Sequence, residues 1–272
     1  MKQLILLFFT YLSLNSSSIN ILDTKILYIE KMDNLKISEL SALAYDKKNL
    51  YALSDKGYLF RFELDYRNKK INLIKPLSAS RLKNKKNKPL KKNKSDAEGM
   101  VYVDNKLLIS FERKPRVEFF SLDAKKIKKF KIPKQLLEKK NYRAKNKMLE
   151  AVAYNDKYGV LTSPELPLKQ FSKCMHTLYT KSSKYPLNVC SNITALEFIS
   201  EDEILILFRD MQLVIYDLHD LSIEYIKFND KFKDYSFEGL TKLEDNLYLI
   251  VSDNDDSKTQ KTLFVLFELI EN

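Results

Sequence analysis

Residues 98–113 read EGMVYVDNKLLISFER: an acid, a short apolar strand, an Asp-Asn turn and a second apolar strand that ends in Glu-Arg. Four further segments have the same form, and they begin at Glu39, Glu150, Glu197 and Glu238. Successive segments begin 59, 52, 47 and 41 residues apart, and the two longest intervals contain lysine-rich runs. Without those runs the unit is about 40–45 residues long, which is the length of a propeller blade.

Each unit has room for four short strands. In the fourth unit, apolar runs at 193–199, 204–209, 211–217 and 223–228 are separated by turns rich in Asn, Asp, Glu and Lys. Residues 134–141 are the best helix candidate, and they are short. We therefore predict an all-β protein, a β-propeller with five countable four-stranded blades, with a sixth, irregular blade as the alternative. The last unit has three clear strands, so we expect the N-terminal strand near 25–32 to supply the fourth and close the ring.

The N-terminus has the pattern of an export signal. Lys2 precedes an apolar stretch at 4–14, and Ser16, Ser17 and Ser18 then supply the small residues that a signal peptidase reads. We predict a cleaved signal at 1–18, with a buried strand or an uncleaved anchor as the alternatives. Residues 19–272 would then form a single propeller domain, expected in the periplasm or secreted. No apolar run reaches 18 residues, so we expect no transmembrane segment in the mature chain.

An oxidising compartment allows disulfide bonds, and Cys174 and Cys190 are the two cysteines of the chain. Their spacing leaves open whether they pair or stay free.

The net charge of +11 is unevenly distributed along the 272 residues. Two insertions, at 81–94 and 125–147, carry net charges of +8 and +10, so the rest of the chain is acidic. We expect both runs to be solvated loops that rest on anionic surfaces. A nucleic-acid site needs stacking aromatics among its basic residues, and the first run has none, so we expect no nucleic-acid partner. We expect a monomer.

Paired polar residues mark the two ends of each hairpin. An antiparallel hairpin returns to the end where it began, so the acid before the first strand should lie beside the residue that ends the second. The second positions are Asp55, Glu112, Glu165, Arg209 with Asp210, and Asp253. If the first strands are innermost, these pairs converge on one mouth of the central channel, with Asp96, Asp234 and Asp255 nearby.

Carboxylates that share one mouth repel each other and need a counter-charge. A bound hard cation, above all Ca²⁺, takes six to eight oxygen ligands from such a ring. We predict metal ligands at Glu39, Asp55, Asp96 and Asp253. Arginine is rare, with 7 residues against 40 lysines, yet Arg113, Arg116 and Arg209 stand at strand ends; we predict that these three bind an anionic ligand. The alternative is a structural ring of polar caps and ion pairs.

Several segments together resemble the phytase-like family, also called "esterase-like activity of phytase". They are DAEGMVYVDNKLLISFERKPRVEFFSL (96–122), NKMLEAVAY (146–154), ITALEFISEDEILILFRD (193–210) and FEGLTKLEDNLYLIVSDNDDSKTQKTLFVLFEL (237–269). The matching positions are Asp96, Glu98, Glu112, Arg113, Arg116, Asn146, Glu150, Arg209, Glu238, Gly239, Asp253 and Gln260. Ser236 stands where the pattern expects Asn, and the third unit follows the pattern loosely around Glu165. The resemblance implies an exported propeller that hydrolyses phosphate or carboxylic esters.

The sequence argues against several other chemistries. Neither His176 nor His219 lies in an Arg-His-Gly motif, and the Gly-x-Ser-x-Gly elbow, the His-Glu-x-x-His motif and the Walker loop are missing from the sequence. Carboxylates must therefore carry any catalysis, and the candidates are Glu98, Glu112, Glu150 and Glu238. One hypothesis is a metal-dependent esterase or phosphoesterase that acts on an anionic small-molecule ester. The other is a non-catalytic periplasmic propeller that binds a ligand or a protein.

Overall fold

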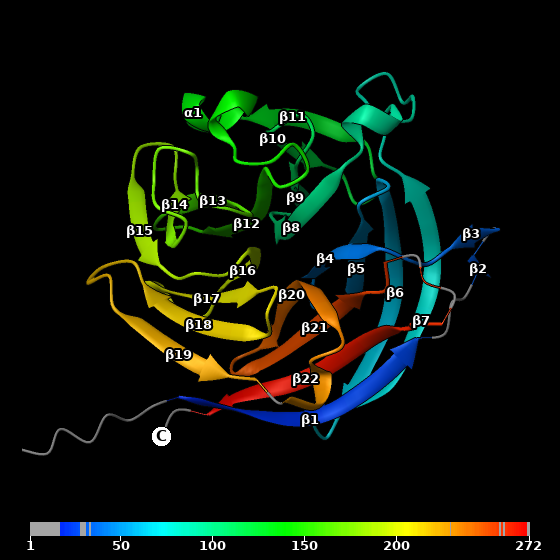
Figure 1. Cartoon of the computed structure of the whole chain (residues 1–272). Coiled ribbons are helices and arrows are strands. Elements are labelled where there is room, and N and C mark those ends of the chain that lie inside the picture. The colour runs from blue at the N-terminus through cyan, green and yellow to red at the C-terminus, as the bar shows by residue number, and fades with distance from the viewer. Residues whose placement is uncertain are drawn as a thin grey trace, which may run out of the picture.

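The chain forms a ring of β-sheets. The computed structural model describes residues 17–27, 31–32, 34–228, 230–255, 257 and 259–270. Five four-stranded antiparallel sheets stand like blades around a central axis, which confirms the predicted propeller (Figure 1). The described residues contain no sixth four-stranded sheet. The predicted signal peptide falls mostly on residues 1–16, which lie outside the described residues.

The first four blades follow the chain from the innermost strand to the outermost strand. Blade 1 contains β4 (Leu40–Tyr45), β5 (Asn49–Ser54), β6 (Tyr58–Arg67) and β7 (Lys70–Arg81). Blade 2 contains β8 (Ala97–Val103), β9 (Lys106–Phe111), β10 (Arg116–Phe120) and β11 (Lys126–Phe130). Blade 3 contains β12 (Leu149–Asn155), β13 (Gly159–Pro164), β14 (Met175–Tyr179) and β15 (Lys184–Asn188). Blade 4 contains β16 (Ile193–Phe198), β17 (Glu203–Phe208), β18 (Gln212–Asp217) and β19 (Ile223–Lys227), each within one residue of its predicted bounds.

Blade 5 closes the ring with a strand from the N-terminus. It contains β20 (Ser236–Glu244), β21 (Leu247–Asp253), β22 (Thr262–Ile270) and β1 (Ser18–Leu27). The prediction of an N-terminal closing strand is confirmed, but its position near 25–32 was wrong. The strand begins earlier because Ile19 and Ile21 pack between blades 4 and 5, while Leu22 and Leu27 pack between blades 5 and 1. A separate hairpin, β2 (Lys31–Met32) with β3 (Leu35–Lys36), follows.

The core lies between the blades. Five apolar clusters fill the five gaps between neighbouring sheets, so each blade is buried on both faces. Phe62 of blade 1 and Phe264 of blade 5, for example, meet edge to face at 6.3 Å between ring centroids. This explains why the inner strands are almost continuously apolar in sequence, as β17 and β21 show.

In the part of the chain that the structure describes, helical structure is confined to short turns outside the blades. The predicted helix at 134–141 appears as α1 (Lys134–Leu137) followed by the 3₁₀ turn η2 (Lys139–Asn141). Two further 3₁₀ turns are η1 (Lys92–Lys94) and η3 (Asp230–Phe232). Cys174 and Cys190 form a disulfide that joins the entry of β14 to the exit of β15. Among the helices of the described chain, none is long and apolar enough to cross a membrane.

Candidate functional site

The two ends of each inner hairpin meet, as the sequence predicts. The backbone N–H of Asp55 donates to the carbonyl of Glu39 at 3.2 Å, and that of Glu112 donates to the carbonyl of Asp96 at 3.0 Å. In blade 3 the N–H of Glu165 donates to Met148 at 2.8 Å. Polar residues far apart in the chain are therefore brought to the same end of the ring.

These hairpin ends enclose a cavity of about 270 Å³ at one mouth of the channel. Its lining consists of Glu39, Asp55, Asp96, Glu98, Glu112, Arg113, Asn146, Glu150, Glu165, Arg209, Glu238, Asp253 and Asp255. The cavity brings together all four catalytic candidates, all four predicted metal ligands, and two of the three predicted anion-binding arginines. We call it the acidic mouth, because ten carboxyl groups and two guanidinium groups of the described residues line it.

A register shift aims the innermost side chains into the channel. In all five blades the pairing of the first strand with the second shifts at the start of the first strand. The residues at the shift are Ser41, Glu98, Glu150, Thr194 and Glu238. Such a β-bulge redirects a side chain that regular alternation would bury between blades. Four of the five line the narrow central channel, and Glu150 lies in the acidic mouth.

The bulge corrects part of the sequence alignment of the repeats. Glu197 was aligned with the other leading acids, but Thr194 occupies the equivalent position, and Glu197 lies near the end of β16, outside the acidic mouth. In blade 1 the equivalent residue is Ser41, whereas Glu39 reaches the mouth from the preceding loop with a positive φ of 52°. The sequence repeats were aligned on their leading acidic residues, whereas the register of the strands is determined by the packing of their apolar residues.

Arg116 does not line the acidic mouth. Its guanidinium lies 3.7 Å from the centre of the Phe111 ring and pairs with Glu118 at 3.2 Å. It also donates to the carbonyl of Lys94. Arg116 therefore stabilises the outer part of blade 2, and the structure gives no support to an anion-binding role in the mouth. Asp210 and Asp234 also lie outside the lining.

The two arginines of the mouth each hold carboxylates. Arg209 donates to Glu238 at 2.8 Å and lies 3.4 Å from Glu165, and Arg113 lies 2.9 Å from Asp96. About half of the Arg113 side chain is exposed, and that of Arg209 is 40% exposed. Each guanidinium thus neutralises part of the acidic ring and still faces solvent, where an anionic ligand can reach it.

Glu165 belongs to the site although the loose motif around it gave only a weak signal. It is 2% exposed and accepts hydrogen bonds from Lys147 at 2.6 Å and Asn192 at 2.7 Å. Lys147 and Asn192 precede the first strands of blades 3 and 4. Neither residue had a sequence signal, because loop residues before a strand follow no repeat pattern.

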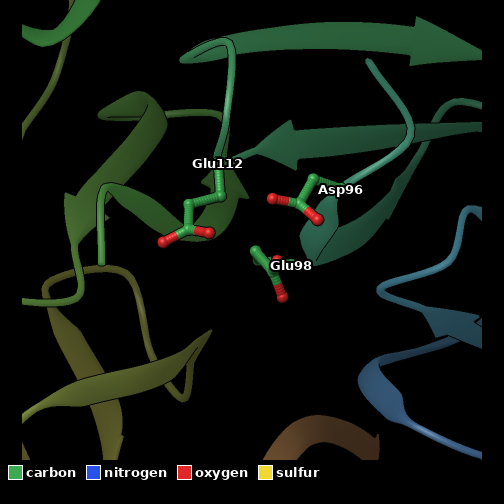
Figure 2. Close-up of side chains that lie close together, drawn as sticks. All are labelled: Asp96, Glu98 and Glu112. Atoms are coloured by element: carbon green, nitrogen blue, oxygen red, sulfur yellow. The ribbon is translucent and has the colours of Figure 1, made fainter. Parts of the chain in front are cut away.

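Two overlapping groups of carboxylates have the spacing of a metal site. In each group, one oxygen from every member lies within 4.8 Å of the others; the groups are Asp96, Glu98 and Glu112, and Glu112, Glu150 and Glu165. Figure 2 shows the first group, whose three side chains lie close together. Glu150 is only 4% exposed, and an oxygen of Glu112 and an oxygen of Glu165 lie within 4.8 Å of one of its own. Buried carboxylates this close together repel one another, so this site favours a cation.

Several carboxyl groups of the acidic mouth keep their protons at a pH at which ordinary carboxyl groups are ionised. Burial, reinforced by Glu39 and Asp253, raises the pKa of Asp55 to about 7, and burial with the charge of Asp96 raises the pKa of Glu112 to about 7. Burial raises the pKa of Glu238 to about 8 against the opposing effect of Arg209. The pKa values of Glu98 and Glu150 also lie well above the usual range, because both are buried among other acids. Cation binding would displace these protons.

The family described as "Phytase-like: Esterase-like activity of phytase" matches residues 36–229, which is more than half of the chain. The chain belongs to the phytase-like family. The matched region of this phytase-like propeller contains most of the acidic mouth, but Glu238, Asp253 and Asp255 lie beyond it. No curated protein is similar enough in sequence to be matched.

Solved structures support the fold alone. The phytase-like chain is similar to the PQQ-bound form of aldose sugar dehydrogenase from Streptomyces coelicolor, with a TM-score of 0.52 and 9% identity over 94% of this chain and 99% of that one. It is also similar to U3-55K, with a TM-score of 0.48 and 8% identity over 85% of this chain and 62% of that one. At such low identities the similarity concerns the arrangement of the blades.

Proposed function

We propose that this phytase-like propeller is a hydrolase of phosphate or carboxylic esters that works in the acidic mouth with a bound divalent cation. The observation that carries the proposal is the gathering of ten carboxyl groups and two arginines, from all five blades or their adjoining loops, around one cavity of about 270 Å³. Membership of the family supports the ester class of substrate. An anionic ester fits the two half-exposed guanidinium groups.

The donor set favours Ca²⁺ as the cation. Among the described residues, no histidine or cysteine lines the cavity. Its charged metal ligands would therefore be carboxylate oxygens, which hard cations prefer. Glu112 belongs to both carboxylate groups and would be the shared ligand, with Asp96 and Glu98 on one side and Glu150 and Glu165 on the other. When bound, the cation would supply a polarised ester oxygen or an activated water.

The chain's own residues would bind and orient the substrate. Arg113 and Arg209 would hold the anionic group, since each presents a planar set of donors at the cavity wall. Glu238, whose pKa is raised to about 8, is the best candidate for general base, because the fraction that is ionised near neutral pH can take a proton from the attacking water. The strong pairing of Glu238 with Arg209 would keep its carboxyl group oriented.

We also propose that the protein is exported. The basic start, the apolar stretch at 4–14 and the serines at 16–18 support a signal peptide. The disulfide between Cys174 and Cys190 supports an oxidising compartment, because such bonds seldom persist in the cytosol.

The decisive test is the double variant Glu112→Gln and Glu238→Gln. Hydrolysis of an aryl phosphate and an aryl ester is measured with and without added Ca²⁺, and cation binding is measured by calorimetry. We expect turnover to fall by about 10²-fold or more, because a ligand and a base are both removed. Circular dichroism and thermal unfolding check that the ring stays folded.

Glu197→Gln is the control for each of the two substitutions, because it makes the same change of one carboxyl group to an amide in a strand that contributes to the ring but not to the mouth. It should leave turnover and cation binding unchanged. Unaltered hydrolysis in the double variant would refute the catalytic proposal. A wild-type protein that binds Ca²⁺ but hydrolyses neither ester would instead favour the non-catalytic, ligand-binding propeller.

A further inference from the structure

The two lysine-rich runs, separate in the sequence, are joined in the fold. The N–H of Lys83 donates to the carbonyl of Ala124 at 2.8 Å, and the N–H of Lys126 donates to the carbonyl of Lys83 at 2.9 Å. These bonds hold 81–94 against the start of 125–147 on the outer side of blade 2. In Figure 1, η1, β11 and α1 lie along this one side of the ring.

The joined runs form a basic surface of high charge density. Their net charges of +8 and +10 add to +18, whereas the whole chain carries +11. Fourteen of their lysines are exposed, and Glu138 is the one acid in either run. We call residues 81–94 and 125–147 together the lysine surface.

The lysine surface borders the acidic mouth and is hollowed. Two cavities of about 790 and 800 Å³ lie on it, and both are lined by Lys114. The first also shares Arg113 and Asn146 with the acidic mouth. Whatever binds the lysine surface therefore lies beside the mouth.

Apolar side chains stand among the lysines. Leu137 of α1 is 49% exposed and Ile127 of β11 is 37% exposed, and both lie within the second run. Lysines that surround exposed aliphatic groups are typical of surfaces that enter a lipid headgroup region, where the ammonium groups meet phosphate and the aliphatic groups reach the acyl boundary.

The same surface lacks the features of a nucleic-acid site. Phe130 and Tyr142 are the aromatics of the two runs; Tyr142 is buried, and Phe130 packs on Phe119, whose ring face is covered by Lys128 at 5.1 Å. Arg143, which could recognise phosphates bidentately, donates instead to the carbonyls of Pro167 and Phe171. Arg81, the other arginine of the two runs, is exposed and lies 5.5 Å from the centre of the Tyr58 ring. The presented charges are therefore mostly flexible ammonium groups, which recognise a dense anionic surface and not a particular base.

From these observations we propose that the lysine surface docks the protein on a membrane that presents anionic lipid headgroups. Each lysine near such a surface adds to the attraction, and salt screens it. Ile127 and Leu137 would enter the headgroup region. Docking would hold the acidic mouth next to the lipid surface.

The test is co-sedimentation of the full-length protein, as recovered from cells, with vesicles of phosphatidylcholine alone or with about a third phosphatidylglycerol. We expect binding to the anionic vesicles to be at least tenfold tighter and to weaken steeply between about 0.1 and 0.5 M salt. The neutral vesicles account for any contribution of the apolar stretch at 4–14. The variant Lys128→Gln, Lys129→Gln and Lys131→Gln should lose at least tenfold in affinity for anionic vesicles.

The matched control replaces three exposed lysines outside the lysine surface: Lys75→Gln, Lys181→Gln and Lys184→Gln. It removes the same charge and should change the affinity less than about twofold. Equal binding to neutral and anionic vesicles would overturn the proposal, and so would equal losses in the two triple variants. Tighter binding to a single-stranded oligonucleotide than to anionic vesicles would assign the surface to nucleic acid instead.

Discussion

At the scale of single residues, Glu150 is the most informative side chain of the acidic mouth. It is almost fully buried, oxygens of Glu112 and Glu165 lie within 4.8 Å of one of its own, and burial beside Glu98 and Glu165 raises its pKa well above the usual range. A fold gains no stability from such a group. Its position at the bulge of β12 makes sense when a cation shares the cavity.

We expect Glu150→Gln to stabilise the cation-free protein at pH 8, because the amide needs no proton to remain neutral. The same substitution should weaken Ca²⁺ binding by about tenfold or more, since one oxygen ligand is lost. Thermal unfolding with chelator and calorimetric titration with Ca²⁺ measure the two effects. Glu197→Gln should leave Ca²⁺ affinity unchanged, and a Glu150→Gln protein with wild-type Ca²⁺ affinity would exclude Glu150 as a ligand.

At the scale of strands, the bulge at the start of each inner strand decides which side chains reach the channel. In blade 2 the bulge needs Gly99: a Cβ there would lie 2.7 Å from the carbonyl oxygen of Glu150 and 2.7 Å from Oγ of Ser110. The N–H of Gly99 also donates to that Oγ at 2.8 Å. The Glu-Gly pair at 98–99 therefore fixes the distance between the inner strands of blades 2 and 3.

Gly99→Ala should separate these strands and displace Glu98 from Glu150. We expect a loss of about 1–3 kcal/mol in the free energy of unfolding, together with weaker Ca²⁺ binding. Gly159→Ala is the control: nothing lies within 4 Å of its Cβ, and its positive φ of 70° costs about 1 kcal/mol. Denaturant unfolding and Ca²⁺ titration of both variants test this. Unchanged Ca²⁺ affinity in Gly99→Ala would mean that the bulge does not position the carboxylates.

At the scale of the whole molecule, ring closure forces like charges together and makes stability depend on pH. Asp55 and Glu112 have pKa values of about 7 and Glu238 of about 8, against ordinary values near 4. The folded state therefore binds more protons than the unfolded state between pH 4 and 8, and stability falls as the pH rises through this window. His176 has the opposite effect. Burial lowers its pKa to about 4, so the stability that its neutral form contributes is lost as the pH falls below about 6.

Without a cation, the melting temperature should therefore decrease from pH 6 to pH 8. Ca²⁺ at about one hundred times its Kd should raise it at pH 8 by on the order of 5–10 °C, and by less at pH 5.5, where protons compete. Differential scanning calorimetry in chelator or in Ca²⁺ measures both slopes. This electrostatic account would be contradicted if the melting temperature rose from pH 6 to pH 8 in chelator, or if Ca²⁺ did not change it.

The amino-acid sequence alone determined the strands, the turns and the five-fold repeat. Alternation of apolar runs with Asn- and Asp-rich turns is a local property, so the strands of blade 4 were predicted within one residue. The pairing of hairpin ends also follows from local geometry. For that reason Glu98, Glu112, Glu150 and Glu238 were correctly expected to meet.

Only the tertiary structure decided what depends on contacts between distant segments. Packing between blades set the bulges, so Thr194 and not Glu197 occupies the fourth inner position. Contacts between distant segments also place Arg116 on the Phe111 ring, put the closing strand at 18–27 and join the two lysine-rich runs. Strand register and ring closure minimise the free energy of the whole core, and no window of sequence contains that information.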